Sequence, residues 1–362
     1  MKKVSIIVAS LLLASNLSAD DSIASAIKAG TVSGDVTLYG EKQNNSGSNK
    51  DAGFTSGSIG VNFETGSLNG FKAAVGFRGN HDFSEEEDGD YSNDETTKTI
   101  FHTANISYAN EYANFTLGRQ EIDLEWLGDF HEAGILGITA IPDTTVVLGL
   151  TQRIAVADAD APLEDFHDFG EDVDYAAVLD IKYEGVKGLL VNPYYYKADN
   201  LAKWYGLKLD YDAEMFGITT HGAKSNEDVR GTEDGQILHF EGRTNFAGLG
   251  LNLGYISTDN DGGAGSMEEL GDNINPLEDG NQVYEVDADT TYFGLSYEIS
   301  GVELGALYGQ TKYSGDKEKE LNLMVDYGIT DNLAIGALFV DVDAEDSDDD
   351  YNKIALTLEY SF

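Results

Sequence analysis

From about residue 31 to its last residue, the chain reads as a succession of strands of about ten residues, each apolar along one face. The closing stretch "IALTLEYSF" shows the pattern: Ile354, Leu356, Leu358, Tyr360 and Phe362 share one face, and the residues between them are small, polar or charged. No segment with a helical period of any length interrupts these strands. Because side chains alternate across a strand, each strand has an apolar face to hide from water. What covers these faces decides the fold.

Two kinds of connection alternate between the strands. Eight links are tight turns of a few residues rich in Gly, Asn, Asp and Pro. The nine other links are mostly longer and strongly acidic, as in "SEEEDGDYSNDE" and "DAEDSDDD", and only those at 198–200 and 313–318 are short. This layout predicts 18 strands. The alternative count is 16, and it depends on the pair of strands around residues 198–200.

The opposite faces of the strands carry charges, Asn, Thr and Gly, which are too polar for a second packed core. Tyr and Phe recur at strand ends, where membrane barrels have aromatic girdles. A closed barrel also leaves no backbone group unpaired in lipid. The sequence therefore predicts an all-β fold, a transmembrane antiparallel β-barrel with short periplasmic turns and long acidic extracellular loops. A soluble β-sandwich or propeller is the alternative, because it alternates too.

The first nineteen residues have the composition of a signal peptide. Lys2 and Lys3 precede an apolar run, and "LSA" follows it before Asp20. The predicted organisation is a signal peptide at 1–19, a short periplasmic segment at 20–30 that could form one or two helical turns, and the barrel at 31–362. Because the chain has no cysteine, it has neither a lipid-modified cysteine nor a disulfide.

The chain is strongly acidic, with 22 basic and 65 acidic side chains. Lys2 and Lys3 belong to the predicted signal peptide, which leaves 20 basic side chains and a formal charge of −45. Such a surface repels nucleic acid, so no nucleic-acid partner is expected. The expected partners are outer-membrane lipid and lipopolysaccharide, small hydrophilic solutes and ions, and a homo-oligomer is left open. No cofactor is expected.

Three stretches resemble the OprD-like, or Opr-family, outer-membrane porins: "GTVSGDVTLYG" from Gly30, "TLGRQEIDLEWLGDFHEAGI" from Thr116, and the terminal "LEYSF". The resemblance implies an eighteen-stranded channel whose third long loop, about 123–133 here, folds inward and narrows the pore. It also implies that the terminal aromatic strand is recognised by the outer-membrane assembly machinery. The predicted assembly signal is Tyr360 and Phe362, and the predicted constriction residues are Asp123, Glu125, Asp129, His131 and Glu132.

Strand parity predicts which charged residues point into the lumen. The basic side chains expected there are Arg78, Arg153, Lys182, Lys208 and Arg243. The acidic ones, on the strands near the barrel closure, are Asp35, Glu41, Glu298, Glu303, Glu320, Asp326 and Glu359. The lumen is thus predicted to have a basic side that faces an acidic side. Arg119 shares parity with the lipid-facing Leu117, so it lies either at the outer headgroup level or at a bulge at Gly118 that turns it inward.

The predicted function is passive diffusion of small hydrophilic solutes and ions through a water-filled channel. The acidic loops concentrate cations at the mouth, which favours a weak cation preference. The alternative is a structural or adhesive barrel with exposed acidic loops and little channel activity. The six histidines match no H-E-x-x-H motif, and the chain has no G-x-S-x-G motif, so no enzymatic activity is expected.

Overall fold

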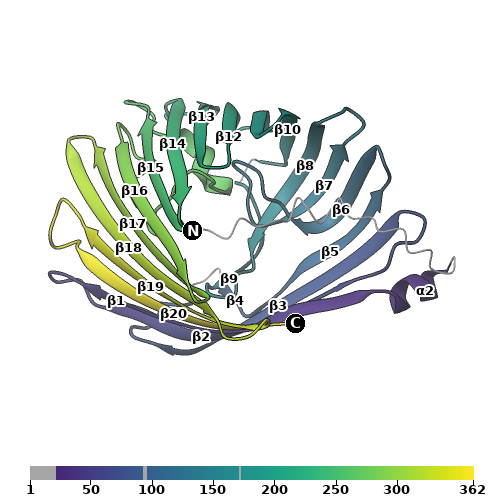
Figure 1. Cartoon of the computed structure of the whole chain (residues 1–362), viewed down its shortest axis with the longest axis horizontal. Helices are drawn as coiled ribbons and strands as arrows, with labels where there is room; N and C mark the ends of the chain where they lie inside the picture. The colour runs from purple at the N-terminus through teal and green to yellow at the C-terminus, as the bar shows by residue number, and fades with distance from the viewer. Residues whose placement is uncertain (1–21, 93–95, 171–172) are drawn as a thin grey trace.

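The computed structural model describes residues 22–92, 96–170 and 173–362, and the predicted signal peptide at 1–19 lies outside them. Within these residues, eighteen antiparallel strands form the wall of a closed barrel, and two short strands, β4 (Thr96–Thr97) and β9 (Leu163–Asp168), lie inside its curve (Figure 1). The wall strands are β1 (Thr31–Asn45), β2 (Ala52–Glu64), β3 (Phe71–Glu85), β5 (Thr99–Ala109), β6 (Ala113–Glu121), β7 (Phe130–Ile138), β8 (Thr144–Val156), β10 (Ala176–Val186), β11 (Leu189–Ala198), β12 (Ala202–Asp212), β13 (Phe216–Glu227), β14 (Gly235–Phe246), β15 (Leu249–Thr258), β16 (Asp289–Ile299), β17 (Val302–Tyr313), β18 (Asp316–Gly328), β19 (Leu333–Asp343) and β20 (Tyr351–Ser361).

The first and last strands close the barrel. β1 pairs with β20 from Asp35 opposite Ser361 to Asn45 opposite Tyr351. Beyond the ladder, Gly34 and Phe362 exchange two backbone hydrogen bonds of 3.0 and 2.9 Å. Closure removes both sheet edges. The predicted count of 18 strands is confirmed, because the three residues between β11 and β12 do separate two strands, and the count of 16 is wrong.

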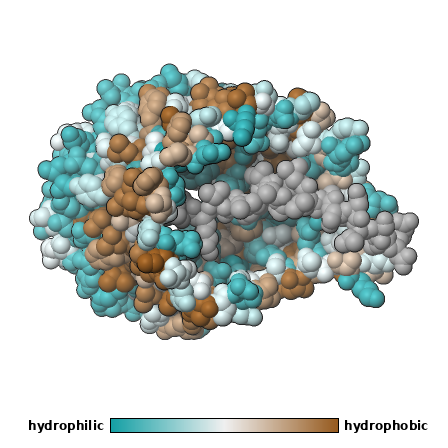
Figure 2. All heavy atoms as spheres, in the orientation of Figure 1, coloured by the Kyte–Doolittle hydropathy of each residue, from teal (hydrophilic) through white to brown (hydrophobic). Residues whose placement is uncertain are grey.

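The outer face of the wall is apolar, as the alternation predicts. On β16, Phe293, Leu295 and Tyr297 are 38–43% exposed, whereas Tyr292, on the other face, is 1% exposed. Apolar side chains gather in brown patches over the strands in Figure 2. In water such a surface would be unfavourable, whereas lipid covers it at no cost. No helix among the described residues is long and apolar enough to span a membrane.

A short helix, α2 (Ile23–Lys28), precedes β1. Ser22 caps its N-terminus and accepts a hydrogen bond of 3.2 Å from the Ser25 amide. The Ala26 carbonyl accepts a hydrogen bond of 2.9 Å from the Gly66 amide in the turn between β2 and β3. The helical turn expected in 20–30 is therefore present, and it is attached at the short-turn end of the barrel.

Deleting Phe362 is expected to lower the amount of protein inserted in the outer membrane severalfold. The deletion removes both backbone hydrogen bonds to Gly34 and the terminal aromatic residue of the proposed assembly signal. The folded, membrane-inserted fraction can be measured by heat-modifiable mobility on gels, with Phe362→Tyr as a control that keeps the aromatic ring. Normal insertion with altered conductance would contradict this assignment.

Candidate functional site

The loop between β6 and β7, residues 122–129 and here called L3, is fixed against the inner wall of the barrel. Trp126 is fully buried, and its Nε1–H donates a hydrogen bond of 2.7 Å to the Tyr194 hydroxyl on β11. Glu125 forms an ion pair of 2.8 Å with Lys208 on β12. Burial raises the pKa of the Glu125 carboxyl, and the Lys208 ammonium opposes that rise. L3 thus reaches across to β11 and β12.

A hydrogen-bonded chain continues behind L3. The Tyr194 hydroxyl, which accepts from Trp126, lies 2.7 Å from His221 Nε2 and can donate its own proton there. That arrangement leaves the proton of His221 on Nδ1, 3.8 Å from Glu125 Oε2. His221 is 1% exposed, so these groups are hidden from solvent. This series of hydrogen bonds holds L3 in position and is not accessible to a solute.

A second loop, residues 259–288 and here called L7, also lies in the lumen, and it contains the 3-10 helix η1 (Gly265–Leu270). It contacts L3 where the Gly128 amide donates to the Leu270 carbonyl at 2.9 Å. At its far side, the amides of Glu278, Asp279 and Gly280 donate to the Glu320 carboxylate on β18 at 3.0, 3.1 and 2.7 Å. L7 therefore connects L3 to the opposite wall.

L7 has a further anchor on β20. The Asp279 carboxylate accepts a hydrogen bond of 2.7 Å from the Tyr351 hydroxyl and forms an ion pair with Lys353. Glu320 is 1% exposed. The prediction placed Glu320 in the pore wall; it does point inward, but L7 covers it.

The loop between β8 and β10, residues 157–175 and here called L4, contains β9 and approaches the β1–β3 wall. Asn80 on β3 donates to the carbonyls of Asp158 and Ala161, both at 2.9 Å. Burial, together with the nearby carboxylates of Asp158 and Glu164 in L4, raises the pKa of Asp129 in L3 from 3.8 to about 6. Three loops, L3, L4 and L7, thus narrow the lumen.

Most of the predicted basic lumen residues form ion pairs. Arg78 on β3 binds Asp35 on β1 with two hydrogen bonds of 2.6 and 2.8 Å. The pair passes over Gly60 on β2, where a Cβ atom would lie 2.6 Å from Asp35 Oδ1, so a larger residue would push the ion pair aside. Two predicted residues, one basic and one acidic, are therefore partners two strands apart and do not face each other across the pore.

Two other predicted basic residues differ in their pairing. Arg243 on β14 forms ion pairs with Asp210 at 2.6 Å and Asp212 at 2.8 Å. Lys182 on β10 shares the inward parity of Asp180, and the described part of the chain places no carboxylate within 4.0 Å of its ammonium. The basic side of the lumen is thus largely neutralised by its own wall.

Arg153 lies beyond an irregularity of β8. A register shift between Thr151 and Arg153 on β8 places Arg153 opposite Glu132 on β7. Glu132 is in turn opposite Arg119, which has the outward parity of Leu117. Arg153 also donates a hydrogen bond to the Phe166 carbonyl and lies 3.6 Å from the Asp168 carboxylate, both in L4, so the predicted place of Arg153 in the pore lining stays a prediction.

Arg119 lies where β5 and β6 separate. Their ladder ends at Ala104 opposite Arg119, and the Arg119 guanidinium then donates to the Phe101 carbonyl at 2.9 Å. It also pairs with Glu132 at 2.8 Å and lies 4.2 Å from the Phe166 ring centroid. Gly118 has φ +122°, and no register shift accompanies it. The Arg119 side chain therefore binds a β5 carbonyl at the long-loop end of the wall, where the backbone pairing of β5 and β6 has ended.

The constriction residues divide into loop and strand residues. Asp123, Glu125 and Asp129 lie in L3, whereas His131 and Glu132 are part of β7. His131 is fully buried between Thr151 and the Gly128 carbonyl, at 2.9 and 2.6 Å. The placement of His131 and Glu132 in the loop is wrong, because β7 begins at Phe130 and pairs at once with β6 and β8.

The predicted acidic residues share the inward parity of their strands. Glu298, Glu303 and Asp326 lie directly opposite one another on β16, β17 and β18, at the short-turn end, and all three are exposed. No basic side chain of the described residues lies within 4.0 Å of them. Glu41 accepts a hydrogen bond of 2.8 Å from Tyr39, and Glu359 lies opposite Thr37 on β1. The inner wall therefore carries a row of free carboxylates.

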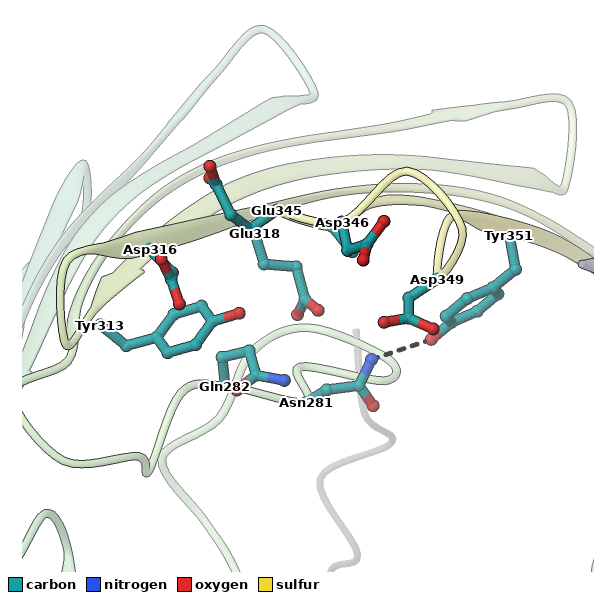
Figure 3. A pocket seen from close by; sticks show the side chains of 10 residues that line it. Asn281, Gln282, Tyr313, Asp316, Glu318, Glu345, Asp346, Asp349 and Tyr351 are labelled. Carbon is teal, nitrogen blue, oxygen red and sulfur yellow. Dashed lines mark hydrogen bonds between the residues drawn. The ribbon is translucent and has the colours of Figure 1, made fainter. Parts of the chain in front are cut away.

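The long-loop end carries another acidic surface. A cavity of about 470 Å³ opens between L7, the β17–β18 hairpin and the β19–β20 loop (Figure 3). Five carboxylates and two tyrosines line it together with Asn281 and Gln282, and no basic side chain does. The carboxylates are those of Asp316, Glu318, Glu345, Asp346 and Asp349.

The lumen contacts of L4 and L7 and the wall residues that hold L3 were not predicted from the sequence. Tyr194 and Trp204, 4% and 1% exposed, point inward on strands where the polar face was expected. One signal was present: Gly206 on β12 lies opposite Tyr194, where a Cβ atom would be 2.3 Å from the Tyr194 hydroxyl. Inward glycines on the wall mark places where another group approaches closely.

Comparisons with known proteins agree with this architecture. The family model "Gram-negative porin" matches residues 5–362. No curated protein matches the chain. Solved structures with a similar fold include Acinetobacter baumannii OccAB1 (TM-score 0.77, 13% identity, 95% of this chain and 99% of that one) and Pseudomonas aeruginosa OccK9 (OpdG) (0.76, 13%, 93% and 99%). Pseudomonas aeruginosa OpdQ is also similar (0.74, 17%, 93% and 98%).

The structural matches confirm the resemblance to OprD-like porins at the level of the fold, and the family match indicates a channel rather than an enzyme. With its closed barrel of eighteen strands and its match over nearly the whole length, the chain belongs to the Gram-negative porin family and is a bacterial outer-membrane β-barrel.

Proposed function

We propose that this barrel is a narrow diffusion channel for small hydrophilic solutes and ions, with a preference for cations. The observation that carries the proposal is the imbalance of free charge in the lumen. Arg78, Lys208, Arg243 and Lys353 are each held by a carboxylate. Among the described residues, the carboxylate row of Glu298, Glu303 and Asp326 and the five carboxylates of the acidic cavity have no basic partner within 4.0 Å, whereas one predicted lumen base, Lys182, is unpaired. A permeating cation therefore meets uncompensated negative charge at both ends.

The alternative is a structural or adhesive barrel that conducts little. Insertion of the purified protein into planar lipid bilayers separates the two functions. We expect stepwise single-channel currents. A protein that is folded by heat-modifiable mobility yet electrically silent would support the structural role and contradict the channel.

Lowering the pH from 8 to 5 is expected to reduce the cation preference. Asp129, with its pKa raised to about 6, is ionised at pH 8 and mostly neutral at pH 5, which removes negative charge from the constriction. The folded state binds this proton more tightly than the unfolded chain does, so protonation of Asp129 stabilises the fold. This stabilisation is fully present below about pH 3.8 and is lost as the pH rises through about 6. The reversal potential in a salt gradient measures the change.

The control for this pH effect is Asp129→Asn, which is neutral at every pH. Asparagine also tolerates the positive φ of +65° at this position. The variant should resemble the wild type at pH 5 and respond less to pH. An equal pH response in both proteins would assign the effect to other groups.

A further inference from the structure

The outward face of the barrel carries a group of lysines at its long-loop end. Lys197 on β11 lies directly opposite Lys203 on β12, two residues beyond the opposed pair Tyr195 and Tyr205. Lys224 on β13 lies opposite Tyr205. We call Lys197, Lys203 and Lys224 the lysine patch. The tyrosines are 41% and 39% exposed, whereas Trp204 on the opposite face is 1% exposed, so the patch faces outward.

The depth of the lysine patch relative to the membrane follows from strand geometry. Residues two apart on a strand are separated by about 6.5 Å. The tyrosines lie where an aromatic girdle meets the membrane interface. Lys197 and Lys203 therefore lie just beyond the girdle and Lys224 lies level with it, so the patch is at the depth of the interface and the headgroups of the outer leaflet. A lysine is costly on the lipid face only near the bilayer midplane, and little at the interface.

The charge at this place is unusual for the chain. Like charges directly opposite on neighbouring strands are destabilising. Asp199 and Asp228 compensate Lys197 and Lys203 at 2.5 and 2.7 Å, but the described residues place no carboxylate within 4.0 Å of the exposed Lys224 ammonium. Three lysines against two aspartates give a net positive patch on a chain whose mature charge is −45.

The loop beside the patch leaves room for a headgroup. β11 and β12 are joined by residues 199–201 alone, whereas most other connections at this end are longer and acidic. β17 and β18 are joined by a similarly short link, and Lys312 there lies opposite Lys317. That second pair has more acidic neighbours, because Asp289 lies opposite Lys312 and Asp316 precedes Lys317.

From this placement we propose that the lysine patch binds the phosphate groups of the lipopolysaccharide that surrounds the barrel in the outer leaflet. The ammonium groups supply the complementary charge, and the tyrosines below them contact the start of the acyl region. The site is continuous with the lipid-facing wall. It is independent of the proposed channel function, because none of its residues lies in the lumen.

The proposal can be tested by native mass spectrometry of the detergent-purified, folded barrel titrated with bisphosphorylated lipid A. The triple variant K197Q/K203Q/K224Q should bind at least about tenfold more weakly, given the contribution of each lysine near an anionic surface. The matched control, K28Q/K72Q/K187Q, neutralises three lysines at the opposite end and should bind as the wild type does. K312Q/K317Q/K319Q should have a smaller effect than the patch variant.

Two further ligands identify what is recognised. Lipid A without phosphates should bind the wild type and the patch variant equally, and inorganic phosphate alone should not be retained by either protein. Equal binding of bisphosphorylated lipid A by wild type and patch variant would overturn the proposal. So would an equal loss in the control at the opposite end, or retention of free phosphate in place of the lipid.

Discussion

Replacing Trp126 with alanine is expected to raise the single-channel conductance by roughly twofold or more, because ion flux follows the open cross-section of the constriction. Trp126 is fully buried and holds L3 against β11. Truncating such a side chain costs about 3–5 kcal/mol of local packing. The barrel wall itself does not depend on this residue, so the variant should still insert and close.

The control for this variant is Trp126→Phe. It keeps an aromatic ring in the site, removes the hydrogen bond of Nε1 to Tyr194, worth about 1 kcal/mol, and loses much less packing than alanine does. Its conductance should lie close to that of the wild type. If Trp126→Ala is folded and conducts as the wild type does, L3 does not limit the pore.

Replacing Glu320 with alanine is expected to increase both the conductance and the noise of the open channel. The change removes the acceptor of three L7 amides and of Asn322 Nδ2, at 2.6 Å. Each donor left buried without a partner costs about 1–3 kcal/mol, so L7 should detach from β18. Recordings at a fixed voltage in planar bilayers give both quantities.

Glu320→Gln gives a graded comparison, because its amide keeps one oxygen that can accept from L7. We expect an effect between those of wild type and alanine. Asp279 anchors L7 to β20 through Tyr351 and Lys353. Adding Asp279→Ala to Glu320→Ala should therefore increase the conductance and noise further. Unchanged conductance and noise in Glu320→Ala would show that L7 does not shape the conducting path.

Much of the wall could be predicted from the sequence, because one physical constraint repeats in every strand. Lipid on one side and water on the other impose a period of two, and the turns mark where each strand ends. The constraint fails where the ladder is irregular. Arg153 shows this: one register shift beside Thr151 changes its parity, and its guanidinium contacts Phe166 and Asp168 of L4.

The constriction could be predicted only in part, because it depends on contacts between distant residues. Glu125 and Lys208 are 83 residues apart, and Glu278 and Glu320 are 42 apart. Parity places Lys208 and Glu320 on the inner face, but it does not say which loop covers them. Several charges that look available in the sequence are therefore paired or buried in the fold, as Arg78, Lys208, Arg243 and Glu320 are, whereas Glu298, Glu303 and Asp326 are exposed.

The central claim is that free carboxylates make this channel prefer cations, and the reversal potential across a salt gradient in a planar bilayer tests it most directly. The wild type should give a potential of the cation-selective sign. E298Q/E303Q/D326N, which neutralises the carboxylate row without touching L3 or L7, should shift it toward the anion-selective sign. A wild-type channel that selects anions, or a triple variant with an unchanged reversal potential, would contradict the account.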